Sequence, residues 1–279
     1  MHIPRITSAF LAFLVTLVVL WVGLPLLGPV YLFLVAVAVQ EYASMLELRG
    51  VPVRRRSLWV VSALTLPASL PAGHPWMTVI GEVPWRELLL IGFALYLLVA
   101  EVFTSNRSSL QSLVFTLFGY VWISWGFGLI ITLRYTPDGV IGMWYLTFPM
   151  LAIIATDVGG YVFGSLWGRR LLAPRISPKK TVEGLLGGLA LALLVVGGTM
   201  ALLPIWTDFR LDLAHLLVFG LAVPLAALAG DLFESLVKRW AGVKDTGVFL
   251  PGHGGVLDRI DSTLIAVPAT YLLVQLLLL

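Results

Sequence analysis

The chain contains no cysteine and few charged residues. Among its 279 residues are four histidines, and Asp, Glu, Lys and Arg together make up only 12%, about half the charged fraction of an average soluble domain. The absence of cysteine excludes disulfide scaffolds and thiolate-bound zinc or iron–sulfur centres. The hydrophobic content is 59% and the mean hydropathy is +0.97. This composition predicts a polytopic membrane protein.

The apolar runs predict helices and exclude a β-barrel, because barrel strands are segments of about 10 residues with alternating polarity. A spanning helix needs about 20 apolar residues. Residues 6–40 contain no Asp, Glu, Lys or Arg, which is enough for two spans with a turn at the central Gly and Pro residues. We expect an all-α transmembrane bundle of about nine spanning helices, at residues 8–25, 29–46, 57–81, 88–100, 108–133, 139–168, 184–207, 213–230 and 262–279.

The basic residues test this count through the positive-inside rule. If the N-terminus is cytoplasmic and nine spans alternate, only Arg86, Arg134 and Arg210 of the 18 basic residues fall outside. The C-terminus is then also outside. We therefore expect a single integral-membrane domain over residues 1–279, with residues 1–140 forming N-terminal helices and residues 141–279 carrying the motifs.

Several acidic residues lie where a membrane should exclude them. Asp157 is deep in an apolar run, and Asp231 and Glu234 are three residues apart at the end of another. A charge at the bilayer centre costs on the order of 3 kcal/mol, so such groups usually face a polar cavity, a metal or a partner. Structural pairing is the alternative, and it is the stronger one for Glu234. We interpret Glu41 and Glu101 as interfacial or packing acids.

Two predicted inner loops, residues 168–181 and 233–261, contain the densest motifs. The second combines a basic cluster, a glycine-rich turn and several carboxylates. Lysine and arginine neutralise phosphate charge, glycines allow backbone N–H groups to approach phosphate oxygens, and aspartates suit Mg²⁺. This combination indicates metal-assisted phosphoryl or nucleotidyl transfer. In the first loop, Ser177 or Thr181 could cap the following helix, and Thr181 with Glu183 nearly forms a capping box.

These motifs resemble a known family. Residues 235–261 match the signature of the phosphatidate cytidylyltransferases (CDP-diacylglycerol synthases), and Ser177–Gly184 is similar to their second motif. Asp157 with Gly160 and Tyr161 resembles a third motif. Residues 1–140 match only in hydrophobic character. The resemblance implies that phosphatidic acid and CTP react to give CDP-diacylglycerol and pyrophosphate, with Mg²⁺ required and a homodimer expected. A second cation would also suit so many carboxylates.

The resemblance also implies roles for individual residues. The expected metal ligands are Asp231, Asp258 and Asp261. The expected catalytic residues are Asp157, Lys179, Asp231, Lys244 and Asp258. The expected substrate-binding residues are Ser177, Lys180, Thr181, Glu183, Lys238, Arg239, Asp245, His253, Gly254, Gly255 and Arg259. A lone histidine between glycines can also be a simple loop donor.

Other functions fit the sequence less well. A secondary transporter would usually show internal repeats and polar groups near the midplane, and neither is apparent. A CDP-alcohol phosphatidyltransferase would carry a D-G-x-x-A-R motif, which the sequence lacks. Transfer of CTP's cytidylyl group or phosphate to a polyprenol-like lipid alcohol remains open. The expected partners are CTP, phosphatidic acid and the lipid bilayer, with no nucleic acid. The expected location is a bacterial-type cytoplasmic (inner) membrane, with the site facing the cytoplasm.

Overall fold

The computed structural model describes residues 14–71, 84–103, 110–205, 211–247 and 254–279. Residues 14–22 are helical. The further elements are α2 (Leu24–Glu47), α3 (Arg55–Ala68), α4 (Trp85–Phe103), α5 (Leu110–Gly119), η2 (Tyr120–Trp125), α6 (Gly126–Arg134), α7 (Gly139–Trp167), β1 (Leu171–Ala173), β2 (Ser177–Thr181), α8 (Val182–Leu202), η3 (Leu203–Ile205), α9 (Leu213–Leu217), η4 (Val218–Ala222), α10 (Val223–Ala241) and α11 (Leu257–Leu277).

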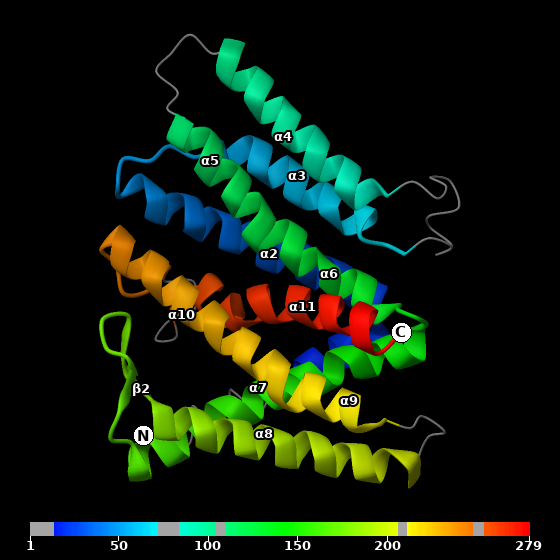
Figure 1. Cartoon of the computed structure of the whole chain (residues 1–279). Helices are drawn as coiled ribbons and strands as arrows, with labels where there is room; N and C mark the ends of the chain where they lie inside the picture. The colour runs from blue at the N-terminus through cyan, green and yellow to red at the C-terminus, as the bar shows by residue number, and fades with distance from the viewer. Residues whose placement is uncertain (1–13, 72–83, 104–109, 206–210, 248–253) are drawn as a thin grey trace.

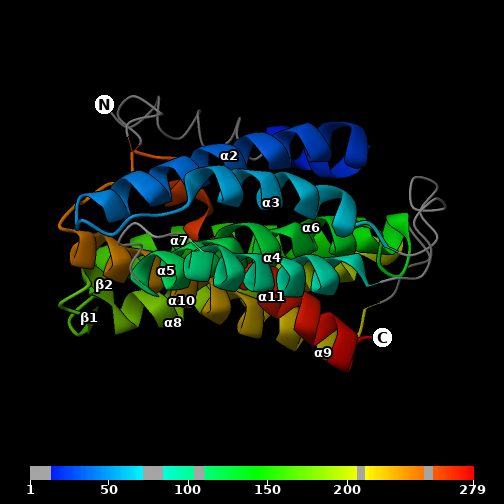
Figure 2. The same ribbon diagram turned by 90° about the horizontal axis from the view of Figure 1, so that it is seen from above.

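The long helices lie side by side and run back and forth between the two ends of the molecule (Figures 1 and 2). Six helical runs in the described residues are long and apolar enough to cross a membrane: Leu24–Glu47, Leu110–Arg134, Gly139–Trp167, Val182–Leu202, Leu213–Ala241 and Leu257–Leu277. Residues 14–22, α3 and α4 correspond to the other three expected spans. The predicted all-α membrane bundle is confirmed.

Several predicted helix boundaries are wrong. The span expected to end at residue 81 ends at Ala68 of α3, with Ser69 as its C-cap. Two further spans were expected to end at residue 230 and to begin at residue 262, where charged residues interrupt the apolar pattern. In the structure α10 continues to Ala241 and α11 begins at Leu257. Hydrophobicity locates the lipid-embedded part of a helix, and a helix extends beyond that part until a cap ends it. Here Gly242, at φ +80°, ends α10. Much of the predicted second inner loop is therefore helical.

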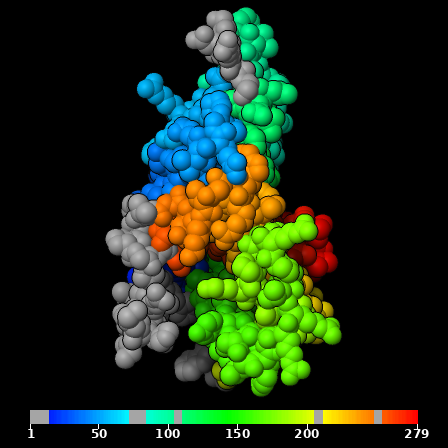
Figure 3. Space-filling view, turned by 90° about the vertical axis from the view of Figure 1, so that its left-hand side faces the viewer, coloured from blue at the N-terminus to red at the C-terminus, as the bar shows by residue number. Residues whose placement is uncertain are grey.

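The predicted first inner loop contains a β-hairpin. Strands β1 and β2 are antiparallel, and Leu171 pairs with Thr181 and Ala173 with Ser177. Its second strand leads directly into α8. Figure 3 shows the hairpin beside the C-terminal part of α10, at the same end of the bundle. The hairpin thus places β2 next to the charged end of another helix.

Helices α7 and α8 pack closely through glycines. A Cβ atom on Gly159 would lie 2.8 Å from the Cα of Gly188, and one on Gly188 would lie 2.6 Å from the carbonyl oxygen of Thr156. Small residues allow membrane helices to approach so closely, where van der Waals packing replaces the hydrophobic effect. This contact fixes α7, which carries Asp157, against the helix that follows the hairpin.

The α7–α8 contact can be tested with a matched pair of substitutions in α8. Gly188→Ala should lower the free energy of unfolding by about 1–3 kcal/mol, because the new methyl group overlaps the Thr156 carbonyl. Gly198→Ala is the control, since a Cβ there meets nothing within 4 Å. It should leave stability unchanged or slightly higher, because alanine favours helix. Unfolding in mixed detergent micelles measures both, and equal stabilities would contradict the close packing.

Candidate active site

Four elements carry the charged side chains of the candidate site: α7, β2, α10 and α11. Figure 1 shows β2 and the C-terminal end of α10 at the same end of the bundle. The contacts form two groups. The first, the Lys180 cluster, consists of Asp157, Lys180, Asp231 and Asp261. The second, the Lys238 cluster, consists of Glu234, Lys238 and Asp258.

The Lys180 cluster joins the hairpin to three helices. The ammonium group of Lys180 forms an ion pair and hydrogen bond with Asp231, and both side chains are 28% exposed. Asp157 lies within electrostatic range of both of these residues, and Asp261 within range of Asp231. Gly230 allows this arrangement, because a Cβ there would lie 2.6 Å from the Asp261 carbonyl oxygen. The Lys180–Asp231 ion pair thus joins β2 to α10, with Asp157 of α7 near both residues and Asp261 of α11 near Asp231.

The Lys238 cluster is more deeply buried. Nζ of Lys238 lies 2.5 Å from Oε2 of Glu234 and 2.7 Å from Oδ1 of Asp258. The side chain of Glu234 is 0% exposed, that of Asp258 8% and that of Lys238 12%. Burying charges is costly unless they are paired, and Lys238 is the shared partner of both acids. The sequence interpretation of Glu234 as a structural partner agrees with this placement.

Asp258 also organises the polypeptide around it. Its Oδ2 accepts hydrogen bonds from the backbone N–H groups of Gly255, at 2.8 Å, and Thr246, at 3.0 Å. Gly254 has φ +83°, and a Cβ there would lie 2.8 Å from the same carboxylate oxygen. Glycine is therefore needed at 254 for both backbone conformation and space. In this structure the N–H of Gly255 donates its hydrogen bond to Asp258. The role of Gly254 and Gly255 in phosphate binding stays a prediction.

The first motif is placed as follows. Thr181 is the N-cap of α8, and its hydroxyl oxygen accepts a hydrogen bond from the N–H of Gly184 at 3.1 Å. Glu183 does not complete a capping box: its Oε2 accepts hydrogen bonds from the N–H groups of Arg169 at 3.0 Å and Arg170 at 3.1 Å. Glu183 thus holds the start of the hairpin. Thr181 and Glu183 thus both form hydrogen bonds within the protein, whereas the sequence left open whether they cap the helix or bind substrate.

The remaining predicted site residues lie around the two clusters or outside the described residues. Arg239 is exposed at the end of α10 and donates a hydrogen bond of 3.5 Å to the Ile176 carbonyl of the hairpin. His253 lies outside the described residues. Of the others, the exposed residues are Lys179, Lys244, Asp245 and Arg259, and the half-buried residue is Ser177.

Sequence reasoning missed Glu41. This residue of α2 is 7% exposed, and its carboxylate accepts hydrogen bonds from the N–H groups of Val256 at 3.0 Å and Leu257 at 2.8 Å. The hydroxyl of Thr246 donates a third bond at 3.2 Å. Interpreting Glu41 as a packing acid was therefore incomplete. By contrast Glu101 pairs with Arg54 at 2.8 Å, as a packing acid should. The only sequence signal for Glu41 was an acid near the end of an otherwise apolar run.

The carboxylates have the chemistry of a magnesium site. Mg²⁺ is commonly held by one or two carboxylates, with substrate phosphates and water completing its coordination. Asp231 of α10 and Asp261 of α11, which lie within electrostatic range of each other, would fit that pattern. Within the described residues, however, no group of three or more His, Cys, Asp or Glu side chains is arranged to hold a metal. Asp258 differs from the other two predicted ligands because both of its oxygens already have protein partners.

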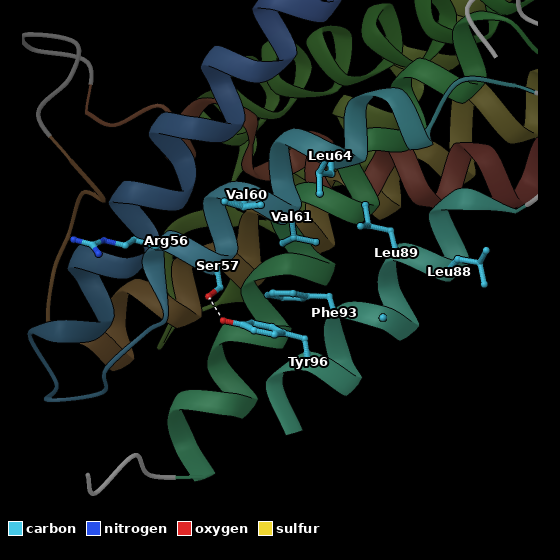
Figure 4. A pocket seen from close by; sticks show the side chains of 10 residues that line it. Arg56, Ser57, Val60, Val61, Leu64, Leu88, Leu89, Phe93 and Tyr96 are labelled. Carbon is cyan, nitrogen blue, oxygen red and sulfur yellow. Dashed lines mark hydrogen bonds between the residues drawn. The ribbon is translucent and has the colours of Figure 1, made fainter. Parts of the chain in front are cut away.

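A groove of about 430 Å³ lies elsewhere, between α3 and α4 (Figure 4). Its walls are mainly apolar, and Ser57 and Tyr96 share a hydrogen bond of 3.0 Å across it. The side chain of Arg56 points away from the ring of Phe93 (Figure 4). The groove contains no acidic side chain and is not the candidate active site.

The arrangement suits chemistry on phosphates. Lysines from β2 and α10 can neutralise several negative charges, and carboxylates beside them can hold a hard cation. Fold and site together define a helical membrane protein with a charged site at one end of its bundle, of a composition suited to phosphates.

Comparison with known proteins agrees with this class. A model of the cytidylyltransferase family matches residues 3–277. The "Phosphatidate cytidylyltransferase" of Staphylococcus saprophyticus is 34% identical over 267 residues, covering 95% of each chain. The proteins of the same name from Staphylococcus haemolyticus and Staphylococcus aureus are 34% identical over 266 residues, also covering 95% of each chain. The chain belongs to the cytidylyltransferase family.

Proposed function

We propose that the chain is a phosphatidate cytidylyltransferase, a nucleotidyltransferase of phospholipid synthesis that converts CTP and phosphatidic acid into CDP-diacylglycerol and pyrophosphate. One observation carries the proposal: relatives of this name are 34% identical to the chain over 95% of its length. The charged residues of the motifs, which pair with one another, support it. The predicted roles of the individual site residues are part of the proposal.

The chemistry requires little of the protein beyond binding and charge neutralisation. An oxygen of the lipid phosphate attacks the α-phosphorus of CTP, a new P–O bond forms there, and the bond to the bridging oxygen breaks. Pyrophosphate leaves with that electron pair. Because the lipid phosphate is already ionised, no residue has to remove a proton from the nucleophile. The side chains must align the two phosphates and offset their mutual repulsion, which are the usual sources of catalysis in such transfers.

The lysines supply that neutralisation. Lys180 and Lys238 reach the site from different elements, and each is already bonded to carboxylates that orient its ammonium group. Asp231 and Asp261, with Asp258 as a third predicted ligand, would hold Mg²⁺, which when bound neutralises charge developing on the transferred phosphorus and the leaving pyrophosphate. Lys179, Arg239, Lys244 and Arg259 would bind the outer phosphates.

The proposal also includes the orientation of the site in the membrane and the oligomeric state of the protein. The site end of the bundle would face the cytoplasm of a bacterial inner membrane, where CTP is available and where the positive-inside rule places the basic residues. Diacyl tails could then stay in the bilayer while the phosphate enters from the side. A homodimer is part of the proposal through the family resemblance.

The activity test uses purified protein in liposomes with labelled CTP, dioleoyl phosphatidic acid and Mg²⁺. We expect CDP-diacylglycerol and pyrophosphate to appear in equal amounts, and both to be lost when EDTA is added. ATP in place of CTP should give little product. Absence of product from folded protein would contradict the proposal. Product formed only with a lipid alcohol as acceptor would show that the site uses a lipid alcohol in place of phosphatidic acid.

A further inference from the structure

We propose that Glu41 is a positioning residue of the active site: from α2, it holds the start of α11 and the segment after α10 in the arrangement that places Asp258. This inference rests on the proposed function and concerns a residue outside the matching signature. Glu41 lies more than 200 positions before its partners in the sequence, in the N-terminal half of the chain and far from residues 235–261.

The first observation is that α11 begins without a cap of its own. Its N-cap residue is Val256, which makes no side-chain capping bond. The first N–H groups of a helix lack partners within the helix and need an acceptor. Oε1 of Glu41 accepts from Val256 at 3.0 Å and Oε2 accepts from Leu257 at 2.8 Å. A carboxylate is well suited to this position, because the N-terminus of a helix carries partial positive charge.

The second observation is that Glu41 binds both stretches that flank residues 248–253. In addition to Val256 and Leu257, the Thr246 hydroxyl donates to Oε2 at 3.2 Å. The adjoining glycines make room for it. A Cβ on Gly247 would lie 2.5 Å from Oε1, and a Cβ on Gly255 would lie 2.5 Å from Oε2. Two of the signature glycines thus allow the close approach of this carboxylate.

The third observation links Glu41 to Asp258. Thr246 donates through its hydroxyl to Glu41 and through its backbone N–H to Asp258. Leu257, which donates to Glu41, directly precedes Asp258 in the chain. Asp258 in turn holds Lys238 at 2.7 Å. Loss of the Glu41 carboxylate would therefore release the segment that positions Asp258 and, through it, Lys238.

The test is Glu41→Gln, which keeps the size of the side chain but replaces one acceptor oxygen by an NH₂ group. That NH₂ group cannot accept the hydrogen bond of a backbone N–H. Turnover with CTP and phosphatidic acid should fall about 10- to 100-fold, the usual effect of losing support for a functional side chain. Hydrogen exchange should rise at the Val256 and Leu257 amides while α2 and α7 remain protected. Glu101→Gln is the matched control, an acid of the N-terminal half paired with Arg54, and it should change neither readout.

A second pair of variants covers the case in which Glu41→Gln does not fold. Thr246→Val removes only the hydroxyl donor and should lower turnover, while Thr246→Ser, which keeps the hydroxyl, should restore it. Full turnover and unchanged exchange in Glu41→Gln would overturn the inference, as would equal effects of Thr246→Val and Thr246→Ser. A protein with no activity towards CTP and phosphatidic acid would refute the proposed function instead, because the exchange readout does not depend on substrate.

Discussion

Asp231→Asn is expected to lower turnover by at least about 10²–10³-fold, the scale of losing one group that stabilises transition-state charge, without unfolding the protein. Asp231 is the acceptor of the Lys180 ion pair and lies beside Asp261 across the close contact at Gly230. The asparagine oxygen can still accept a hydrogen bond from Lys180, so the hairpin should stay in place. The carboxylate charge needed to hold a cation would be lost.

The measurement is the CTP-dependent formation of CDP-diacylglycerol, with elution volume and thermal unfolding recorded for the same preparation. Glu47→Gln is a suitable control, because it also removes one carboxylate from an ion pair, with Arg55 at 2.6 Å, on an exposed surface. It should retain activity. Near-normal turnover in Asp231→Asn would remove Asp231 from the proposed metal site.

Lys238→Met should be strongly destabilising as well as inactive. Removing this lysine leaves Glu234 and Asp258 buried without their shared cation. Breaking a buried ion pair by removing one partner typically costs about 3–5 kcal/mol. Lys180→Met makes the same chemical change in a pair whose two side chains are 28% exposed, where solvent screening reduces the cost to about 1 kcal/mol or less.

Unfolding free energies in mixed micelles compare the two lysine variants directly. The double variant Lys238→Met/Glu234→Gln should recover part of the lost stability, because it removes one of the two acids left without a cation, while Asp258 keeps its backbone N–H donors. It should stay inactive. Equal stabilities for Lys238→Met and Lys180→Met would mean that burial does not determine the strength of these ion pairs.

The bundle could be predicted because hydrophobicity and basic-residue placement act along the whole chain. The long uncharged runs identified the spans. The start of α4, which carries Arg86, and the end of α6, which carries Arg134, lie at the end of the bundle opposite β2, as the alternation requires (Figure 1). Helix ends could not be predicted this way. Asp258 and Asp261 looked like loop residues because charge ends an apolar run, yet both belong to α11.

The site was predictable in composition but not in pairing. The motif residues Asp157, Lys180 and Asp231 were all expected, and the structure brings them together. Sequence spacing could not show that Lys180 pairs with Asp231, 51 positions away, or that Lys238 is shared by two acids. Such partners depend on how helices cross, and on close approaches at glycines such as Gly230. Glu41 was missed for the same reason, because its partners are set by tertiary contacts.

The pairing of Lys180 with Asp231 has a thermodynamic consequence for ligand binding. A phosphate that takes over Lys180 frees the Asp231 carboxylate, and a cation that takes over Asp231 frees the Lys180 ammonium group. Each ligand thus removes the competitor that opposes the other. Linkage makes this effect reciprocal, so the anion and the cation should bind with positive cooperativity even where they do not touch.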